Sequence, residues 1–224
     1  MTQTVWIVRH GNRLDFVNKE WFKTAKRPYD SPLSPDGILQ AQALAQRLKG
    51  EKIAHIFSSP FLRTVQTAQY LAEMLELSLK IESGLSEWLN PERFPAMPEV
   101  LSIQELVKQF PRIELSYTSC ISAQYPESWD EALERAGKTA RCITAKLTDN
   151  ILIVGHGASV LGATMGLVGG SHEFHCAPCS VFKLVRQGQE WILELEGDTS
   201  HLSQNEKLIR FNFLLQALLK PRDI

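Results

Sequence analysis

Short apolar runs rich in β-branched residues alternate along the chain with longer stretches in which apolar residues recur at helical spacing. The short runs are Val5–Val8, Ile53–Phe57, Leu79–Ile81 and Ile151–Val154. Such runs are typical of strands buried on both faces of a parallel sheet, and helical stretches between them are typical of crossover connections. The pattern therefore predicts an α/β fold with three layers, in which a mainly parallel sheet is flanked by helices.

A β-hairpin and two sharply started helices complete this pattern. The apolar segments Val181–Val185 and Trp191–Leu195 are separated by Gln187-Gly188-Gln189, which predicts the hairpin. Ser34 precedes Pro35 and Ser59 precedes Pro60. A serine N-cap followed by proline at the first helical position is a typical helix start. We interpret Ser58 and Ser59 as capping residues, not as nucleophiles, and expect the second helix to run from Pro60 to about Glu76.

The order of the segments predicts a single domain over residues 1–224. Pro91, Pro95 and Pro98 follow one another closely after the third strand, so residues from about 90 to 145 are expected to form an insertion that is first irregular and then helical. The apolar segment Leu208–Leu219 predicts a docked helix. A membrane anchor and a homodimer contact are the alternatives at this segment.

Ile151–Gly170 contains no Lys, Arg, Asp or Glu and is long enough to span a bilayer. His156 and several glycines lie within it, so we interpret it as a buried strand followed by a packed helix, and expect no membrane partner. The formal charge of the chain is only −1 and its basic residues are dispersed, which argues against nucleic acid as a partner.

The cysteines and the amino terminus bear on the compartment. The four cysteines are too few and too loosely spaced for a disulfide framework in a chain of 224 residues, which predicts free thiols. The first residues show neither the basic region nor the long apolar run of a signal peptide. We therefore expect a cytoplasmic protein.

The candidate chemistry begins at the end of the first strand, where Arg9-His10-Gly11 follows directly. Ligands of parallel α/β sheets bind outside the carboxyl ends of the strands. A cation, an imidazole and a glycine at this position suit a phosphate, because the backbone N–H of Gly11 can donate to an anion without a side chain in the way. His156 follows the Ile151–Val154 strand in the same way, so both histidines are expected at one rim.

Arg63, near the start of the second helix, adds a planar donor fork to this crevice. A phosphate held by several cations needs no metal, so no metal and no cofactor are expected. The same arginines disfavour the imidazolium form of His10, which makes His10 the candidate nucleophile for an in-line attack on phosphorus. Glu87 is the candidate proton donor to the leaving oxygen, with Trp88 expected to raise the pKa of its carboxyl.

Two other groups of residues leave alternatives open. His172, His175, Cys176 and Cys179 suit zinc by residue type, but they are interpreted as a loop that lines the rim of the site. The aromatic residues near Arg13 and Glu87 would favour aryl or other apolar phosphate esters if they face the crevice, and core packing is the alternative; they are Trp21, Phe22, Trp88 and Phe94.

These residues resemble the histidine phosphatase superfamily, the group named for phosphoglycerate mutase. The similar segments are Val5–Gly11, Leu33–Ala41, Phe57–Ala68, Gly84–Glu87 and Ile153–Gly157. Arg13 with Asp15, Glu87-Trp88 and Glu127–Asp130 are similar to the phosphatase domains of suppressor-of-T-cell-receptor-signalling proteins and ecdysteroid-phosphate phosphatase.

The resemblance implies a phosphoglycerate-mutase-like fold, whereas the identity of the substrate does not carry over from the family. Together with the residues above, it predicts a metal-independent phosphomonoester hydrolase that forms a phosphohistidine and acts on a small-molecule or aryl phosphate. It also implies that His10 is the nucleophile, that Glu87 is the proton donor, and that the phosphoryl group is bound by Arg9, Arg13, Arg63 and His156.

A phosphoglycerate-type mutase is the first alternative, although the proline-broken segment after Glu87 lacks the basic stretch of those enzymes. A non-catalytic module that binds phosphorylated ligands is the second alternative, and it would need neither His10 nor Glu87.

Overall fold

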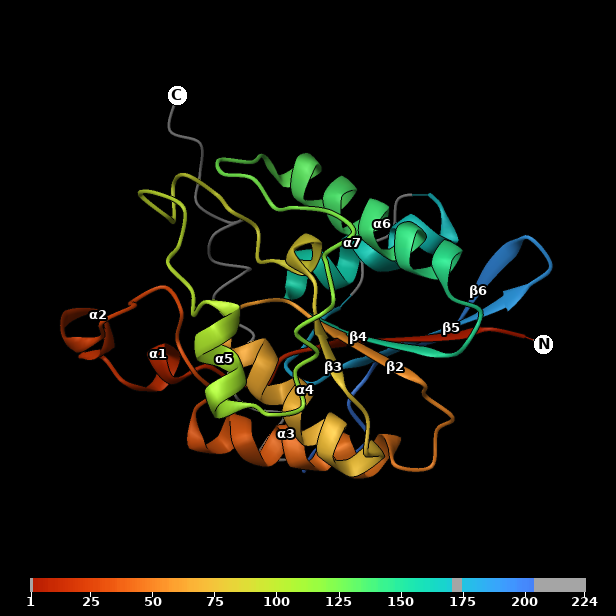
Figure 1. Cartoon of the computed structure of the whole chain (residues 1–224), viewed down its shortest axis with the longest axis horizontal. Helices are drawn as coiled ribbons and strands as arrows, with labels where there is room; N and C mark the ends of the chain where they lie inside the picture. The colour runs from red at the N-terminus through yellow and green to blue at the C-terminus, as the bar shows by residue number, and fades with distance from the viewer. Residues whose placement is uncertain (1, 171–174, 204–224) are drawn as a thin grey trace.

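A six-stranded sheet with the order β3-β2-β4-β1-β5-β6 runs through the molecule (Figure 1). The structure is a computed structural model and describes residues 2–170 and 175–203. The strands are β1 (Thr4–Arg9), β2 (His55–Ser58), β3 (Leu79–Ile81), β4 (Ile151–Gly155), β5 (Val181–Gln187) and β6 (Glu190–Asp198). β1 to β4 pair in parallel, whereas β5 runs antiparallel to β1 and to β6. The predictions of a mainly parallel sheet and of a carboxyl-terminal hairpin are confirmed.

Helices cover both faces of the sheet. They are α1 (Leu14–Val17), α2 (Trp21–Thr24), α3 (Pro35–Leu48), α4 (Leu62–Leu75), the short 3₁₀ helix η1 (Ser83–Leu85), α5 (Ile103–Gln109), α6 (Trp129–Lys146) and α7 (Gly157–Val168). α6 and α7 lie on one face, and α3 and α4 lie on the other (Figure 1). Alternate residues of β1 point to opposite faces, so that Val5 and Ile7 join one apolar core while Trp6 and Val8 join the other. The three-layer prediction is confirmed.

The two predicted helix starts differ in outcome. Ser34 caps α3, because its hydroxyl accepts a hydrogen bond from the N–H of Gly37, and Pro35 is the first helical residue. The prediction for α4 is wrong by two residues: the N-cap is Phe61 and not Ser59. A carboxylate oxygen of Asp30 accepts from the N–H of Leu62 at 2.7 Å instead. The cap of α4 thus comes from a distant segment, which local sequence does not reveal.

The segment expected as an insertion keeps contact with the sheet. Apart from α5, it is irregular up to residue 128, and Ile113 forms a parallel bridge with Leu79 beside β3. Its last part, α6, is the crossover helix between β3 and β4 and packs against α7. The prolines therefore mark the irregular part, whereas the helical part belongs to the layer that covers the sheet.

Of the two apolar segments that raise the question of a membrane span or anchor, the structure describes the first. Ile151–Gly170 forms β4 and α7, as interpreted from the sequence. Within residues 2–170 and 175–203, no helix has the length and apolar character needed to cross a bilayer. Leu208–Leu219 lies outside the described residues, so the docked helix expected there remains a prediction, with a membrane anchor or a homodimer contact as the alternatives.

Candidate active site

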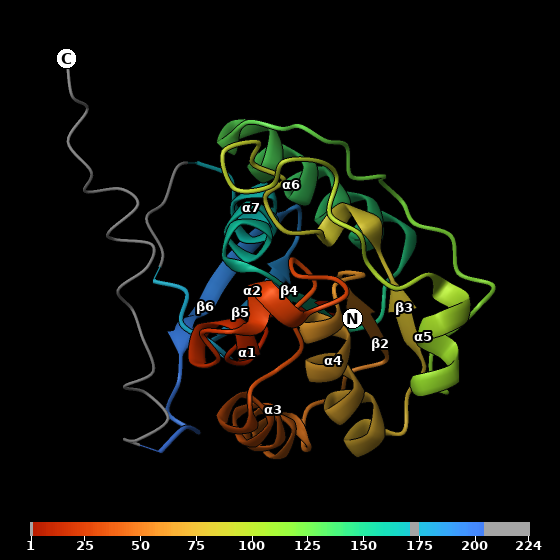
Figure 2. The same cartoon turned by 90° about the vertical axis from the view of Figure 1, so that its left-hand side faces the viewer.

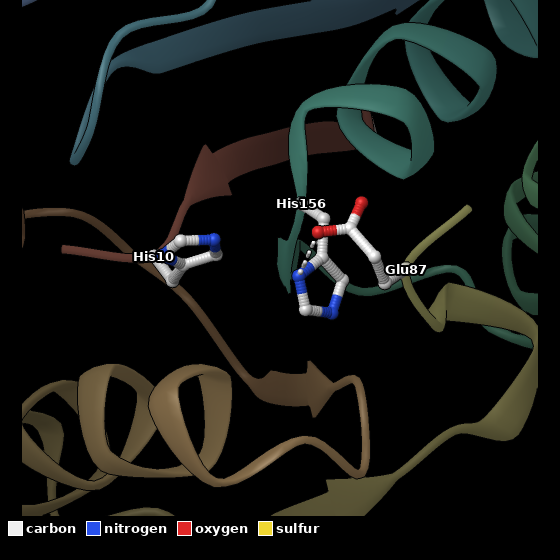
Figure 3. A group of neighbouring side chains, drawn as sticks. All are labelled: His10, Glu87 and His156. Carbon is white, nitrogen blue, oxygen red and sulfur yellow. Dashed lines mark ion pairs between the residues drawn. The ribbon is translucent and has the colours of Figure 1, made fainter. Parts of the chain in front are cut away.

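The carboxyl ends of the parallel strands bring the predicted residues together. His10 follows the last residue of β1, and His156 follows β4 as the N-cap of α7. Their ring centroids are 5.2 Å apart, so the prediction that both histidines reach one rim is confirmed. Figure 3 shows the Glu87 carboxylate beside the His156 ring, with the His10 ring directed towards both. In Figure 2, α1 and α2 lie in front of this end of the sheet.

Arg63 connects the three side chains. It lies in the first turn of α4 and is only 1% exposed. Its Nε donates to His10 Nε2 at 3.3 Å, and its Nη2 lies 3.1 Å from both Glu87 Oε2 and His156 Nδ1. Burial lowers the pKa of Arg63 to about 9, so the group remains a cation at neutral pH. The prediction that Arg63 joins the two histidines in one crevice is confirmed, and Glu87 lies beside them.

The geometry of His10 fixes which ring nitrogen is basic. Nδ1 lies 2.6 Å from the carbonyl oxygen of Gly11. A carbonyl can only accept, so Nδ1 carries the proton and Nε2 keeps its lone pair. Burial, followed by the charges of Arg63, His156 and Arg9, holds the pKa of His10 well below its ordinary value. The predicted neutral imidazole is supported, but burial contributes more to it than the arginines do.

His156 is held from two sides. Ser59 Oγ lies 2.8 Å from His156 Nε2, and Glu87 Oε2 lies 3.5 Å from His156 Nδ1. Burial, followed by the Arg63 charge, also holds the pKa of His156 well below its ordinary value. The hydroxyl of Ser59 therefore orients a histidine of the site, a role that its interpretation as a helix cap missed. The sequence did contain a signal for this role of Ser59. Ser59 directly follows β2, just as His10 directly follows β1 and His156 directly follows β4.

The prediction that apolar surroundings raise the pKa of Glu87 is wrong. Burial alone does raise it, but the charges of Arg93, Arg63 and Arg13 outweigh burial and lower the pKa of Glu87 to about 2. The Trp88 ring packs against Trp129 with centroids 5.0 Å apart, and its Nε1 donates to the carbonyl of Glu127. Without substrate, Glu87 is therefore a carboxylate.

Arg93 is a residue of this site that the sequence analysis missed. It is exposed and lies in a turn after Pro91, where its N–H donates to the carbonyl of Asn90. Its charge is nevertheless the largest of those that lower the pKa of Glu87. The irregular segment after Glu87 thus supplies a cation to the mouth of the site, and no motif marks that cation in the sequence.

Gly11 is held by contacts within the protein. Its N–H donates to Thr67 Oγ1 at 3.2 Å and is therefore already used within the protein. A Cβ at this position would lie 2.5 Å from the carbonyl oxygen of Gly37 in α3. Glycine is thus required by the close approach of two backbones, and the binding of phosphate by its N–H remains a prediction.

Arg13 is buried and pairs with Asp15 through two hydrogen bonds, from Nε to Oδ1 at 2.9 Å and from Nη2 to Oδ2. Its guanidinium lies 4.5 Å from the centroid of the Phe16 ring. The charge of Arg13 lowers the pKa values of Glu87 and His156, which places it near the site. Its predicted contact with a phosphoryl group remains a prediction.

Two buried arginine donors have no hydrogen-bond acceptor within the part of the chain that the structure describes. They are Nε of Arg9 and Nη1 of Arg63. Arg9 uses Nη1 to donate to the carbonyl of Cys176 at 2.6 Å. A buried donor left without a partner costs about 1–3 kcal/mol. An oxyanion bound beside His10 could satisfy both donors, which agrees with the expected phosphate site.

The loop that contains Cys176 and Cys179 lines this rim, as interpreted from the sequence. The N–H of Cys179 lies 3.2 Å from the carbonyl of Arg9 and 3.3 Å from that of His10. His172 lies outside the described residues. Among residues 2–170 and 175–203, His175, Cys176 and Cys179 do not form a group close enough to share a metal ion, so the structure gives no support to a zinc site there.

The group that could share a metal, within the same described part, is His10, Glu87 and His156, whose ligand atoms lie within 4.8 Å of one another. Arg63 lies within hydrogen-bond distance of all three. A metal cation among them would be repelled by this buried guanidinium, whereas an anion would be attracted. The arrangement therefore fits an oxyanion better than a metal.

Several curated proteins are similar in sequence. The human ubiquitin-associated and SH3 domain-containing protein A is 31% identical over an alignment 206 positions long, which covers 75% of this chain and 31% of the relative. The yeast (Saccharomyces cerevisiae) transcription factor tau 55 kDa subunit is 24% identical and covers 95% of this chain, which spans 59% of that relative. The chain thus spans less than two thirds of these relatives. A probable phosphoglycerate mutase GpmB from Yersinia pestis is 29% identical and covers 88% of this chain and 94% of the relative.

Solved structures share the fold. Ecdysone phosphate phosphatase from Bombix mori, in complex with tungstate, superposes with a TM-score of 0.72 at 22% identity and covers 85% of this chain and 91% of its own. A phosphoserine phosphatase mutant from Entamoeba histolytica, in complex with phosphoserine, has a TM-score of 0.60 at 22% identity, with 90% and 100% covered. The predicted phosphoglycerate-mutase-like fold is confirmed.

The family model of the histidine phosphatase superfamily (branch 1) matches residues 5–199, a range that includes every residue of the site described above. The chain therefore belongs to the histidine phosphatase superfamily.

Proposed function

We propose that this protein is a phosphomonoester hydrolase that works through a phosphohistidine at His10, on a small phosphorylated molecule. The observation that carries the proposal is the state of the His10 ring. Nδ1 donates to the carbonyl of Gly11 at 2.6 Å, so Nε2 is unprotonated; its lone pair accepts from Nε of the buried Arg63 at 3.3 Å, a donor that a phosphate oxygen takes over when the substrate binds. A neutral, oriented imidazole next to unpartnered cationic donors is what attack on a phosphate ester requires.

In the first step, Nε2 of His10 attacks phosphorus in line with the leaving oxygen. The N–P bond forms while the P–O bond breaks, and its electron pair stays on the leaving oxygen. Glu87, which has taken a proton from the bound monoanion of the ester, donates it to that oxygen, which yields the free alcohol and phosphohistidine. The Nδ1–H of His10 keeps its hydrogen bond to Gly11 and stabilises the charge that the ring acquires.

In the second step, a water molecule attacks the phosphohistidine. The carboxylate of Glu87 accepts a proton from this water as the new P–O bond forms. The N–P bond breaks and its electron pair returns to Nε2 of His10, so that inorganic phosphate leaves and the ring is restored. Arg9, Arg13, Arg63 and His156 bind the phosphoryl oxygens in both steps.

We propose that neither step uses a metal ion. The support is the set of arginines that surrounds the site, because their charges can neutralise a phosphate dianion directly. Arg63 contacts each of the three side chains that could otherwise share a metal within the part of the chain that the structure describes. The expected result is that turnover is unchanged after dialysis against EDTA.

We propose an aryl or another apolar phosphate ester as the substrate class. Support comes from aromatic rings in the segments on either side of the site. Phe22 is 53% exposed and its ring lies 6.0 Å from that of Tyr29, which in turn lies 5.3 Å from the ring of the buried Phe94. Phe94 is the neighbour of Arg93, whose charge acts on Glu87.

The test is an assay of phosphate release from a set of aryl, alkyl and sugar phosphates, with the wild type and His10→Ala. The wild type should release phosphate and yield acid-labile phosphate on the protein after rapid quenching. His10→Ala should lose both by at least about 10³-fold, because the nucleophile is gone. An active His10→Ala protein would overturn the proposal. If the wild type is inactive on every ester, the non-catalytic binding module becomes the better description.

A phosphoglycerate-type mutase is the second candidate, because a probable phosphoglycerate mutase is 29% identical over nearly its full length. Such an enzyme returns the phosphoryl group from His10 to a second hydroxyl instead of to water. A requirement for a bisphosphorylated primer, with a product that keeps its phosphate, would favour this candidate over the hydrolase.

A further inference from the structure

Arg135, a residue of α6, is attached to the loop that carries Glu87. It is only 8% exposed, and its guanidinium donates to three backbone carbonyls within four residues of this loop region. The distances are 2.7 Å to the oxygen of Gly84, 3.2 Å to that of Ser86 and 3.1 Å to that of Glu87 itself. The backbone of the candidate proton donor is therefore fixed to a helix of the covering layer, beside which η1 lies (Figure 2).

Glu127 completes this attachment from the other side. Its carboxylate accepts from Arg135 Nε at 2.9 Å and from Arg135 Nη2 at 2.6 Å. The same carboxylate accepts from the N–H of Leu89 at 2.9 Å, and the carbonyl of Glu127 accepts from the Trp88 indole at 3.1 Å. Hydrogen bonds from one ion pair thus hold the loop on both sides of Glu87.

The base of this arrangement is rigid. The helix α6 begins with a capping box, in which Ser128 and Glu131 satisfy each other's backbone N–H groups. Within the helix, Ala136, Ala140 and Ile143 are buried. A loop held by several hydrogen bonds to such a helix has little freedom to turn, so the direction of the Glu87 side chain is set from its backbone.

A buried ion pair is weak support for stability alone, since apolar residues of similar volume often stabilise a fold as well. The planar fork of an arginine, however, fixes direction, because several acceptors must lie at set positions around it. Here the acceptors are the backbone carbonyls next to Glu87. Proton transfer depends strongly on such direction, and small displacements of a catalytic group are costly in rate.

We propose that Arg135 and Glu127 are positioning residues for Glu87, which aim its carboxyl at the leaving oxygen of the phosphate ester. The proposal rests on the proposed function and adds to it the part of the fold that holds the proton donor. Both residues act through the backbone and neighbours of Glu87, so their loss affects the step that needs a proton.

The test uses the basicity of the leaving oxygen. An alkyl phosphate has a basic leaving oxygen that needs a proton, whereas 2,4-dinitrophenyl phosphate has a weakly basic one that leaves without it. Release of the leaving group is measured in single-turnover experiments, so that hydrolysis of the phosphohistidine does not limit the rate. Arg135→Lys keeps the charge but loses the planar fork, and Glu127→Gln keeps the shape but loses the ion pair.

Both variants should slow the alkyl ester by at least about tenfold and the dinitrophenyl ester by no more than about twofold, which follows from the usual contribution of general acid catalysis. Glu87→Gln should show the same pattern with a larger loss. The double variant Arg135→Lys/Glu87→Gln should be no slower on the alkyl ester than Glu87→Gln alone. Arg141→Lys, an exposed arginine of the same helix that donates to the carbonyl of Gly166, is the matched control and should slow neither ester.

Equal losses on the two esters for Arg135→Lys and Glu127→Gln would overturn the proposal, because a general loss of structure does not distinguish leaving groups. Losses that add to that of Glu87→Gln would also overturn it. If Arg135→Lys does not fold, Glu127→Gln decides by the same comparison. If the wild type releases neither leaving group, the proposed function itself fails. If instead the wild type is active on both esters and the variants slow both equally, the proposed function stands and only the positioning role fails.

Discussion

At the scale of single residues, the charge of Arg63 governs the site. Its buried guanidinium meets His10, Glu87 and His156, and one of its donors remains without an acceptor in the described part of the chain. A bound phosphate would accept a hydrogen bond from that donor. Its negative charge beside Glu87 would favour the protonated form of the Glu87 carboxyl group. We therefore expect Glu87 to gain its proton when the substrate binds, with the monoanion of the ester as the source.

Arg93→Gln tests this electrostatic picture. Removal of the positive charge that acts most strongly on Glu87 should raise the pKa of Glu87 from its value of about 2. The measurement is a titration of the glutamate carboxyl carbons by ¹³C NMR, with Glu87→Gln used to assign the signal. Arg47→Gln, in which the lost cation belongs to α3 and pairs with Glu51, should leave the signal in place. An unchanged Glu87 titration in Arg93→Gln would contradict the assigned role of Arg93.

At the scale of elements, the start of α4 is important because Arg63 lies in its first turn. The side chain of the N-cap residue Phe61 provides no hydrogen bond, and the buried carboxylate of Asp30 accepts from Leu62 instead. The connection between α2 and α3 thus fixes the start of the helix that presents Arg63. Burial raises the pKa of Asp30, in opposition to its hydrogen bond with Leu62.

Asp30→Ala removes this cap and should lower the free energy of unfolding by about 1 kcal/mol, within the usual range for a lost N-cap acceptor. Asp30→Asn keeps an oxygen that can accept from Leu62 and should cost less. Urea unfolding at pH 7, followed by circular dichroism, measures both. If the alanine and asparagine variants were equally stable, the hydrogen bond from Leu62 would not be what Asp30 contributes.

The elements also show what the sequence could reveal. The strands and the Ser34 cap were predictable, because each depends on residues that are neighbours in the chain. The cap by Asp30 and the packing of Gly11 against Gly37 depend on contacts between segments 26 or more positions apart. Such contacts leave no periodicity. Arg93 was missed for the same reason, since its segment carries no motif and only the folded loop brings its charge near Glu87.

At the scale of the whole molecule, the sheet gathers charged and polar groups at one end and buries them there. His10 is 1% exposed and His156 is fully buried, and both are held in the neutral form. In the unfolded chain each ring would titrate at its ordinary value of about 6.5. The fold therefore excludes two protons that the unfolded chain binds in mild acid, and this difference links the site to the stability of the whole protein.

Stability should consequently fall as the pH falls below about 6.5, because both folded-state pKa values are depressed and the unfolded state binds more protons. Between about pH 6 and pH 5, two histidines protonated only in the unfolded chain give a slope approaching about 2.7 kcal/mol per pH unit. Urea unfolding across this range measures the slope.

His10→Gln and His156→Gln should each reduce this slope by about half, since each removes one of the two protons. The control variant His55→Gln should keep most of it, because His55 lies at the start of β2, away from the site, where it is partly exposed next to Asp149. A stability independent of pH in this window would show that the two rings take up protons in the folded protein, and would remove the neutral nucleophile on which the proposed chemistry depends.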